Sequence, residues 1–180
     1  MQRIALGWLV YDLTGSGLLL GIVGFCSQIL TFLVAPLGGI VADRADRRGL
    51  LVITQTAAMI QAFILAGLTY AGWITVWQIV ALGLMLGLVN AFDIPIRQSF
   101  VVEMLEVRED LPNAIALNSF VFNGARMVGP WLAGLLVAKV GEGLCFLLNG
   151  VTFLAVIVAL IAMRIKPVER QANRRDVLHN

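Results

Sequence analysis

Two long uncharged runs, residues 18–37 and 50–71, dominate the first half of the chain and flank a short charged loop. Each run has about the 20 apolar residues that a helix needs to cross a bilayer. The loop between them, GGIVADRADRR at residues 38–48, carries three arginines and two aspartates. This pattern predicts two membrane-spanning helices with their charged connection at the membrane surface.

Composition extends this interpretation to the whole chain. Of the 180 residues, 59% are hydrophobic and 13% are charged, whereas soluble domains have about 25% charged residues. So few charges cannot cover a water-facing surface, which excludes a soluble globular protein and indicates an integral membrane protein. Cys26 and Cys145 both lie inside apolar runs, so we expect small buried side chains rather than a disulfide framework.

We predict an all-α membrane protein with five complete spans and one partial span. The complete spans are residues 18–37, 50–71, 74–92, 114–138 and 144–163, and the partial span is 4–13. The partial span has about half the length required to cross, so we expect a fragment whose first helix begins upstream. Gln2 and Arg3 would then lie at mid-membrane depth. Residues 1–163 would form one transmembrane unit, and 164–180 a basic tail or the start of a linker.

Lysine and arginine fall almost entirely on one side of these predicted spans. If the spans alternate in direction, ten lie in 44–48, 93–113 and 164–180, and Lys139 stands alone on the opposite side. The positive-inside rule then places the ten, and the carboxy terminus, in the cytoplasm. Apolar and acidic residues mix in 97–107, which fits either a short helix on the membrane surface or an extended connection.

Arg126 is the strongest single candidate for a functional residue, because it lies near the centre of the fifth predicted span. A charge at that depth costs roughly 2.5–3.5 kcal/mol and usually faces a bundle interior or an aqueous cavity. At helical spacing, Ser119 and Asn123 share its face. Two interpretations stay open: these three residues form a substrate or coupling site, or Arg126 is structural and bonds to a neighbouring helix.

We expect the remaining intramembrane polar residues to bond across helices rather than to bind a substrate. They are Gln28, Thr31, Thr54, Gln55, Gln61, Gln78 and Asn90. No phosphate-binding glycine loop occurs in the sequence, so we do not expect ATP-driven transport by this chain. The single histidine, His179, lies in the tail, and no nucleophile–base pair is visible. We therefore expect no metal site, cofactor, nucleic-acid partner or enzymatic activity.

The loop at 38–48 resembles the signature loop between the second and third helices of the major facilitator superfamily of transporters. Asp46 stands near the place of that family's second glycine. The resemblance implies a conformational latch at the cytoplasmic face, with a charge cluster of Asp43, Arg47 and Asp93 at its centre. The full set of latch residues is Gly39, Asp43, Arg44, Arg47, Arg48 and Asp93. Ordinary solvated loop charge is the alternative.

The fifth span contains GPWLAG at residues 129–134, which looks like the fifth-helix motif of exporters in that superfamily. The family motif normally ends in two glycines, and Ala133 departs from it. Proline interrupts the hydrogen bonds of a helix backbone, and small residues let helices approach closely. The resemblance implies an exporter, and a bent packing interface formed by Gly129, Pro130 and Gly134 is the plainer interpretation.

Longer matches resemble the transmembrane secretion effector family, the group that contains the enterobactin exporter. They are VYDLTGS at 10–16, FDIPIRQ at 92–98, LPNA at 111–114, LNS at 117–119, NGAR at 123–126 and FLLN at 146–149. The resemblance implies the six-helix amino-terminal half of a major facilitator bundle, with its first helix truncated, in the lipid bilayer of a bacterial inner membrane.

This resemblance also implies a function. It predicts proton-coupled efflux of a siderophore or drug-like small molecule, carried out together with a missing carboxy-terminal half. A small membrane interaction or assembly subunit without transport activity stays open as the alternative.

Overall fold

The computed structural model describes residues 2–44, 46–103 and 111–163, and all regular secondary structure in this part of the chain is α-helical. The helices are α1 (Gln2–Thr14), α2 (Gly17–Arg44), α3 (Arg47–Tyr70), α4 (Val76–Glu103), α5 (Leu111–Val140) and α6 (Glu142–Ala162). Among the described residues, five helices, α2 to α6, are long and apolar enough to cross a membrane. The all-α half-bundle expected from the sequence is therefore confirmed.

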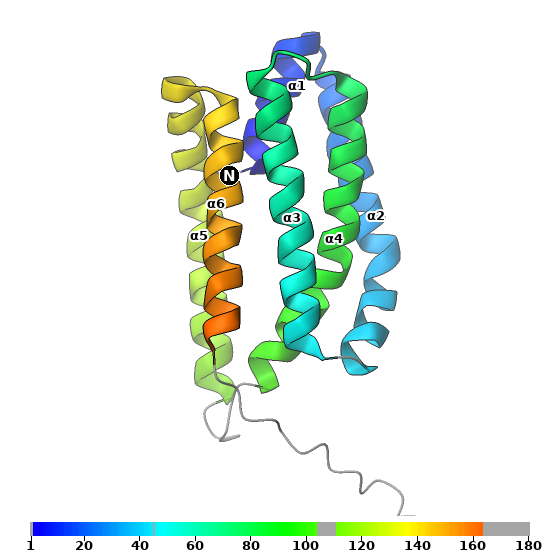
Figure 1. The fold of residues 1–180 in the computed structure, drawn as a ribbon, viewed down its shortest axis with the longest axis vertical. Coiled ribbons are helices and arrows are strands. Elements are labelled where there is room, and N and C mark those ends of the chain that lie inside the picture. Colours follow the sequence, from blue (N-terminus) through cyan, green and yellow to red (C-terminus); the bar gives the residue numbers. More distant parts are fainter. Residues whose placement is uncertain (1, 45, 104–110, 164–180) are drawn as a thin grey trace, which may run out of the picture.

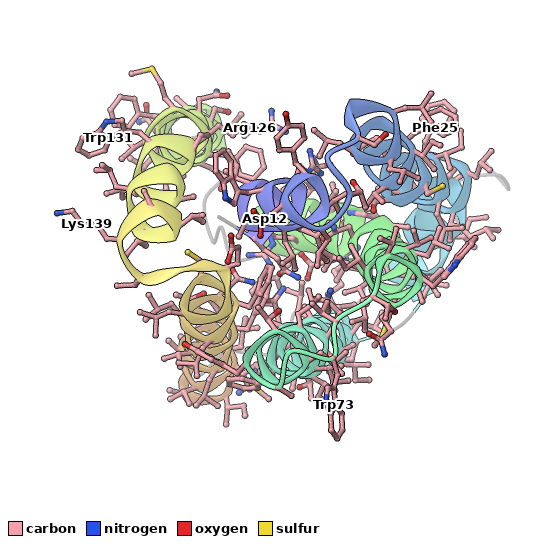
Figure 2. All side chains as sticks on the ribbon, turned by 90° about the horizontal axis from the view of Figure 1, so that it is seen from above. Asp12, Phe25, Trp73, Arg126, Trp131 and Lys139 are labelled. Carbon is pink, nitrogen blue, oxygen red and sulfur yellow. The ribbon has the colours of Figure 1, made fainter. Side chains whose placement is uncertain are left out.

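The helices run up and down in one bundle (Figure 1). α3 packs against both α4 and α6, α2 packs on α4, and α5 packs on α6. α1 contacts α2, α4, α5 and α6 and lies near the middle of the bundle when it is seen from above (Figure 2). With 13 residues, α1 is about 20 Å long, shorter than a hydrocarbon layer of about 30 Å. The described part of α1 contributes side chains to the core.

Three tight turns join the helices at the end that is uppermost in Figure 1. Each turn contains a glycine with positive φ: Gly15 at 62°, Gly72 at 69° and Gly141 at 81°. Residues with a Cβ rarely adopt this conformation, so the glycines allow the turns to be short. Short turns keep consecutive helices as antiparallel neighbours, which pairs α1 with α2, α3 with α4 and α5 with α6.

Glycines also set how closely α2 approaches α4. Gly83 and Gly87 of α4 face Ser27 of α2, and Gly38 of α2 faces the backbone of Ala91. A Cβ at Gly87 or Gly38 would collide with a carbonyl oxygen of the opposite helix. Small residues four apart are the pattern that lets membrane helices approach closely. The α2–α4 contact therefore depends on the absence of side chains at these positions.

α4 extends further than the sequence analysis predicted. The helix does not end at Phe92 but continues through Pro95 to Glu103, so neither a separate surface helix nor an extended connection begins at Arg97. Proline removes one backbone donor from a helix and bends it, and α4 turns aside in its lower part in Figure 1. The rest of that predicted segment, residues 104–107, lies outside the described residues.

Buried apolar side chains form two groups at different levels of the bundle. The larger group surrounds α1 and consists of Ala5, Leu6, Leu9, Val10, Val23, Leu65, Ala66, Ile79, Cys145 and Phe146. The smaller group joins α3, α4 and α6 and consists of Leu51, Ile96, Phe100 and Leu160. Cys145 is buried and Cys26 is partly buried, and both are free thiols, in agreement with the sequence analysis.

Candidate functional sites

Asp93 of α4 is a buried carboxylate with partners on two helices. At Oδ1 it accepts hydrogen bonds from Thr54 Oγ1 (2.8 Å) and Gln55 Nε2 (2.6 Å), both on α3. At Oδ2 it accepts from Arg97 Nη2 (2.9 Å) and Nε (3.2 Å). Asp93 is only 7% exposed, and a buried charge is tolerated when it is both paired and hydrogen-bonded. This cluster joins α3 to α4 with the charge compensated.

Arg97 is a partner that the sequence analysis missed. Asp93 and Arg97 are spaced i,i+4, a spacing that brings side chains together on one helix, but a span ending at Phe92 leaves Arg97 outside it. The predicted latch instead grouped Asp93 with Asp43 and Arg47. The side chains of Asp43 and Arg44 lie outside the described part of the chain, so the latch stays a prediction.

Arg48, another residue of the predicted latch, holds the end of α6. Its guanidinium group donates to the carbonyl oxygens of Leu160 (2.8 Å) and Ile161 (2.7 Å). Carbonyls in the last turn of a helix have no partners within that helix, and the helix dipole favours a cation there. Arg48 thus connects the start of α3 to the end of α6.

Two residues of the loop, Asp46 and Gly39, have different structural roles from those that the family resemblance implies. Asp46, which stands where the resemblance predicts a glycine, is the N-cap of α3 and accepts a hydrogen bond from the backbone N of Gly49 at 2.9 Å. Aspartate is among the favoured residues at that position. Gly39, assigned to the latch, has open space at its Cβ position, whereas its neighbour Gly38 makes the close approach to α4.

The predicted substrate residues of α5 share an exposed face. Ser119, Asn123 and Arg126 are all exposed, and the guanidinium carbon of Arg126 lies 4.8 Å from the centre of the Phe122 ring, a cation–π contact. Figure 2 shows Arg126 on the side of α5 that is turned toward α1, whereas Trp131 points away from the bundle. Their role as a substrate or coupling site stays a prediction.

The predicted packing residues of α5 make no close helix contact within the described part of the chain. The Cβ positions of Gly129 and Gly134 have open space around them, and Pro130 is exposed. In this stretch only Ala133 is buried. A packing role for the three residues therefore needs a surface other than the described helices, and it stays a prediction.

A chain of carboxamide hydrogen bonds connects α1 to three other helices. Asn149 Nδ2 on α6 donates to Gln2 Oε1 (2.7 Å), and Gln2 Nε2 donates to Gln61 Oε1 on α3 (2.6 Å). Gln61 Nε2 then donates to the carbonyl oxygen of Leu82 on α4 (3.2 Å). Gln2 and Gln61 are buried, so the chain satisfies amide groups that would otherwise lack partners. It fixes the position of the first turn of α1.

A cavity of about 410 Å³ lies between α1, α2 and α4, within the range of about 300–1,000 Å³ that is usual for small-molecule sites. Its lining contains one charged residue, several neutral hydrogen-bonding residues and several glycines. The lining residues are Gln2, Arg3, Leu6, Gly7, Leu20, Val23, Gly24, Ser27, Gln28, Thr31, Gly83, Leu86, Gly87 and Asn90. The sequence analysis assigned Gln28, Thr31 and Asn90 to packing and did not group them with Arg3.

Comparison with known proteins assigns the family. Residues 1–180 match the family described as transmembrane secretion effector. The chain belongs to this family. It is also similar to a curated protein, the staphyloferrin A transporter of Staphylococcus aureus (strain NCTC 8325 / PS 47), with 28% identity over 175 residues. No solved structure matches the chain.

The match to the staphyloferrin A transporter covers 96% of this secretion effector chain but 44% of that relative. The chain therefore spans less than half the length of the relative it matches. Together with the helical bundle described above, this agrees with the amino-terminal half of a larger transmembrane secretion effector. The family resemblance drawn from the loop at 38–48 and the motifs of the later spans is confirmed.

Proposed function

We propose that this chain is the amino-terminal half of a secondary active transporter that exports a small molecule of the siderophore or drug-like class. The family supports transport in general rather than catalysis, and the named relative supports a siderophore as cargo. The observation that carries the proposal is the cavity between α1, α2 and α4, whose lining combines apolar residues and glycines with a few polar groups. A mostly apolar hollow with a few convergent polar groups is the usual form of a small-molecule site.

The proposed setting is the bacterial inner membrane, with the basic tail in the cytoplasm and a carboxy-terminal half as partner. The excess of lysine and arginine on one side of the spans predicted from the sequence supports this orientation. The exposed faces of α2 and α5 support the presence of a carboxy-terminal half that packs on them, because only 6% of the apolar window of each helix is buried. In transporters built from two such halves, the substrate site lies between them.

Arg126 is proposed to attract an anionic group of the substrate or to act in proton coupling, together with Asn123 and Ser119. An arginine keeps its charge at all accessible pH values, so it does not carry the proton itself. It acts by binding an anion or by favouring the ionised form of a nearby carboxylate. Its exposed position on the side of α5 that faces α1 supports this role.

The loop between α2 and α3 is proposed to form a latch that stabilises one conformation of the transporter. Asp43, Arg47 and Asp93 supply its charges, and two acids with one or more arginines suit an arrangement that exchanges partners. The bond between Asp93 and Arg97 would be one of the two arrangements. Asp43→Asn in the complete transporter should then reduce transport while the amount of protein in the membrane is unchanged. Unchanged transport would contradict the latch.

The test of the proposed function is flux in reconstituted liposomes. The complete transporter should move a siderophore or a fluorescent dye across the membrane when a pH gradient is imposed, and an ionophore that collapses the gradient should stop it. Transport at the same rate with and without the pH gradient would contradict proton coupling. No flux of any substrate, together with stable capture of another membrane protein, would favour the interaction or assembly subunit, for which the exposed α5 face is the supporting observation.

A further inference from the structure

The cavity between α1, α2 and α4 contains an arginine, Arg3, that has no acidic partner among the described residues. Arg3 is exposed within the cavity lining, and its Nη2 donates a hydrogen bond to Gln28 Oε1 at 3.3 Å. Among the described residues it forms no ion pair. The guanidinium group carries several N–H donors, so most of them are available to a ligand. None of the described lining residues is acidic, and the cavity therefore has a net positive character.

The depth of Arg3 makes this charge significant. α1 ends at Thr14, at the level of the tight turns, and Arg3 lies 11 residues before that end. This separation corresponds to about 16 Å of helix, roughly half of a hydrocarbon layer of about 30 Å. An arginine at such a depth is costly unless it faces a wet cavity or an opposite charge. The carboxamide chain through the adjacent Gln2 holds this turn in place, so Arg3 is presented on a fixed helix.

The other polar lining residues complete a site for oxygen-rich groups. Gln28 lies next to Arg3, and the amide of Asn90 forms no hydrogen bond within the described part of the chain. Gly24 leaves open space at its Cβ position, which keeps room between α1 and α2. Arginine pairs with carboxylates through two parallel hydrogen bonds, and neutral amides can bind further oxygens of the same ligand.

We propose that this cavity binds a carboxylate group of the transported molecule, with Arg3 as the anion-binding residue and Gln28 and Asn90 as neutral hydrogen-bonding partners. The site is separate from Arg126, which does not line the cavity. The proposal rests on the proposed transport function in that it describes the ligand as a cargo, and it assigns the cargo to the class of organic carboxylates.

The test is calorimetric binding of tricarballylate to the complete transporter in nanodiscs of zwitterionic lipid, with the neutral triamide of the same acid as control. The acid should bind and the triamide should not. Arg3→Gln should weaken binding at least about tenfold, as expected for loss of a charged hydrogen bond, and Arg3→Lys should weaken it less. Lys139→Gln removes an exposed positive charge outside the cavity lining and should bind tricarballylate like wild type. Equal binding by wild type and Arg3→Gln, or no binding to wild type, would overturn the proposal.

A second pair of variants tests the cavity without touching its charge. Gly24→Leu places a side chain in the open space of the cavity and should weaken binding, whereas Gly21→Leu on the same helix also has open space but does not line the cavity. Gly21→Leu should bind like wild type. Equal binding by both variants would place the anion elsewhere and overturn the proposal.

Two further arms separate the alternatives. In nanodiscs that contain phosphatidylglycerol, the transporter should bind tricarballylate as tightly as it does in zwitterionic nanodiscs. Weaker binding in the presence of phosphatidylglycerol would identify the lipid headgroup as a competing occupant and overturn the cargo assignment. Dye or siderophore flux in liposomes is measured in parallel. If flux continues while Arg3→Gln leaves anion binding unchanged, only this inference fails. If the anion binds through Arg3 and no flux is found, the proposed transport function fails instead.

Discussion

α3 and α5 are both apolar helices that contain polar residues, but they use those residues in different ways. In α3, 44% of the apolar window is buried, against 6% in α5. Thr54, Gln55 and Gln61 of α3 all donate hydrogen bonds to α4, and Gln61 also accepts one from Gln2 of α1. Asn123 and Arg126 of α5 are exposed, and Arg126 contacts the ring of Phe122 on its own helix. Burial and hydrogen-bond partners thus determine whether a polar residue in a span is structural or is available to bind a ligand. Its polarity alone does not distinguish these two roles.

The largest expected effect comes from removing the carboxylate at the α3–α4 contact. Asp93→Leu leaves Thr54 and Gln55 without an acceptor and Arg97 without its counter-charge. We expect a loss of about 3 kcal/mol of stability, near the lower limit for a broken buried pair because Arg97 is partly exposed. Thermal unfolding of the complete transporter in detergent measures it. Arg126→Gln also removes one charge, and we expect it to change stability by less than about 0.5 kcal/mol.

Equal losses of stability from Asp93→Leu and Arg126→Gln would mean that Arg126 is structural and that α3 and α5 use their polar residues alike. A loss with Asp93→Leu alone would support the difference between the two helices.

The next effect comes from filling the contact between α3 and α6. A Cβ at Gly150 would approach Phe63 of α3 to 2.7 Å, whereas the Cβ position of Gly67, on the exposed side of α3, has open space around it. Gly150→Leu should therefore cost about 1–3 kcal/mol through overpacking, and Gly67→Leu should be tolerated. The yield of monodisperse protein and its unfolding temperature report both. Tolerance of Gly150→Leu would mean that α3 is not packed on this side as described.

A smaller effect is expected from the carboxamide chain. Gln61→Met removes the bonds to Gln2 and to the carbonyl of Leu82, and an intramembrane hydrogen bond contributes about 0.6 kcal/mol on average. We expect a loss of about 1 kcal/mol, seen as a lower unfolding temperature. Asn123→Leu on α5 should leave the unfolding temperature unchanged and reduce flux. The reverse result for this pair would exchange the roles assigned to α3 and α5.

The helices could be predicted from the sequence because apolar runs of the length of a membrane require them. Contacts between distant segments could not. Arg48 contacts carbonyls more than a hundred residues away, and the cavity depends on which faces of α1, α2 and α4 meet. Two features could have been predicted from sequence spacing. They are the i,i+4 pair of Asp93 and Arg97 and the spacing of Gly83 and Gly87 in α4. The first was missed because the fourth span was predicted to end at Phe92, whereas α4 continues through Pro95 to Glu103.

The polar residues Ser119, Asn123 and Arg126 of α5 are exposed, whereas Thr54, Gln55 and Gln61 of α3 are buried between helices. Thiol accessibility measures this difference in the complete transporter with Cys26, Cys145 and any further cysteine replaced. A cysteine at position 126 should react with a membrane-impermeant maleimide and be protected by bound substrate, and a cysteine at position 61 should not react. If the cysteine at 126 is unreactive from both sides of the membrane, or the one at 61 reacts as fast, the account is contradicted.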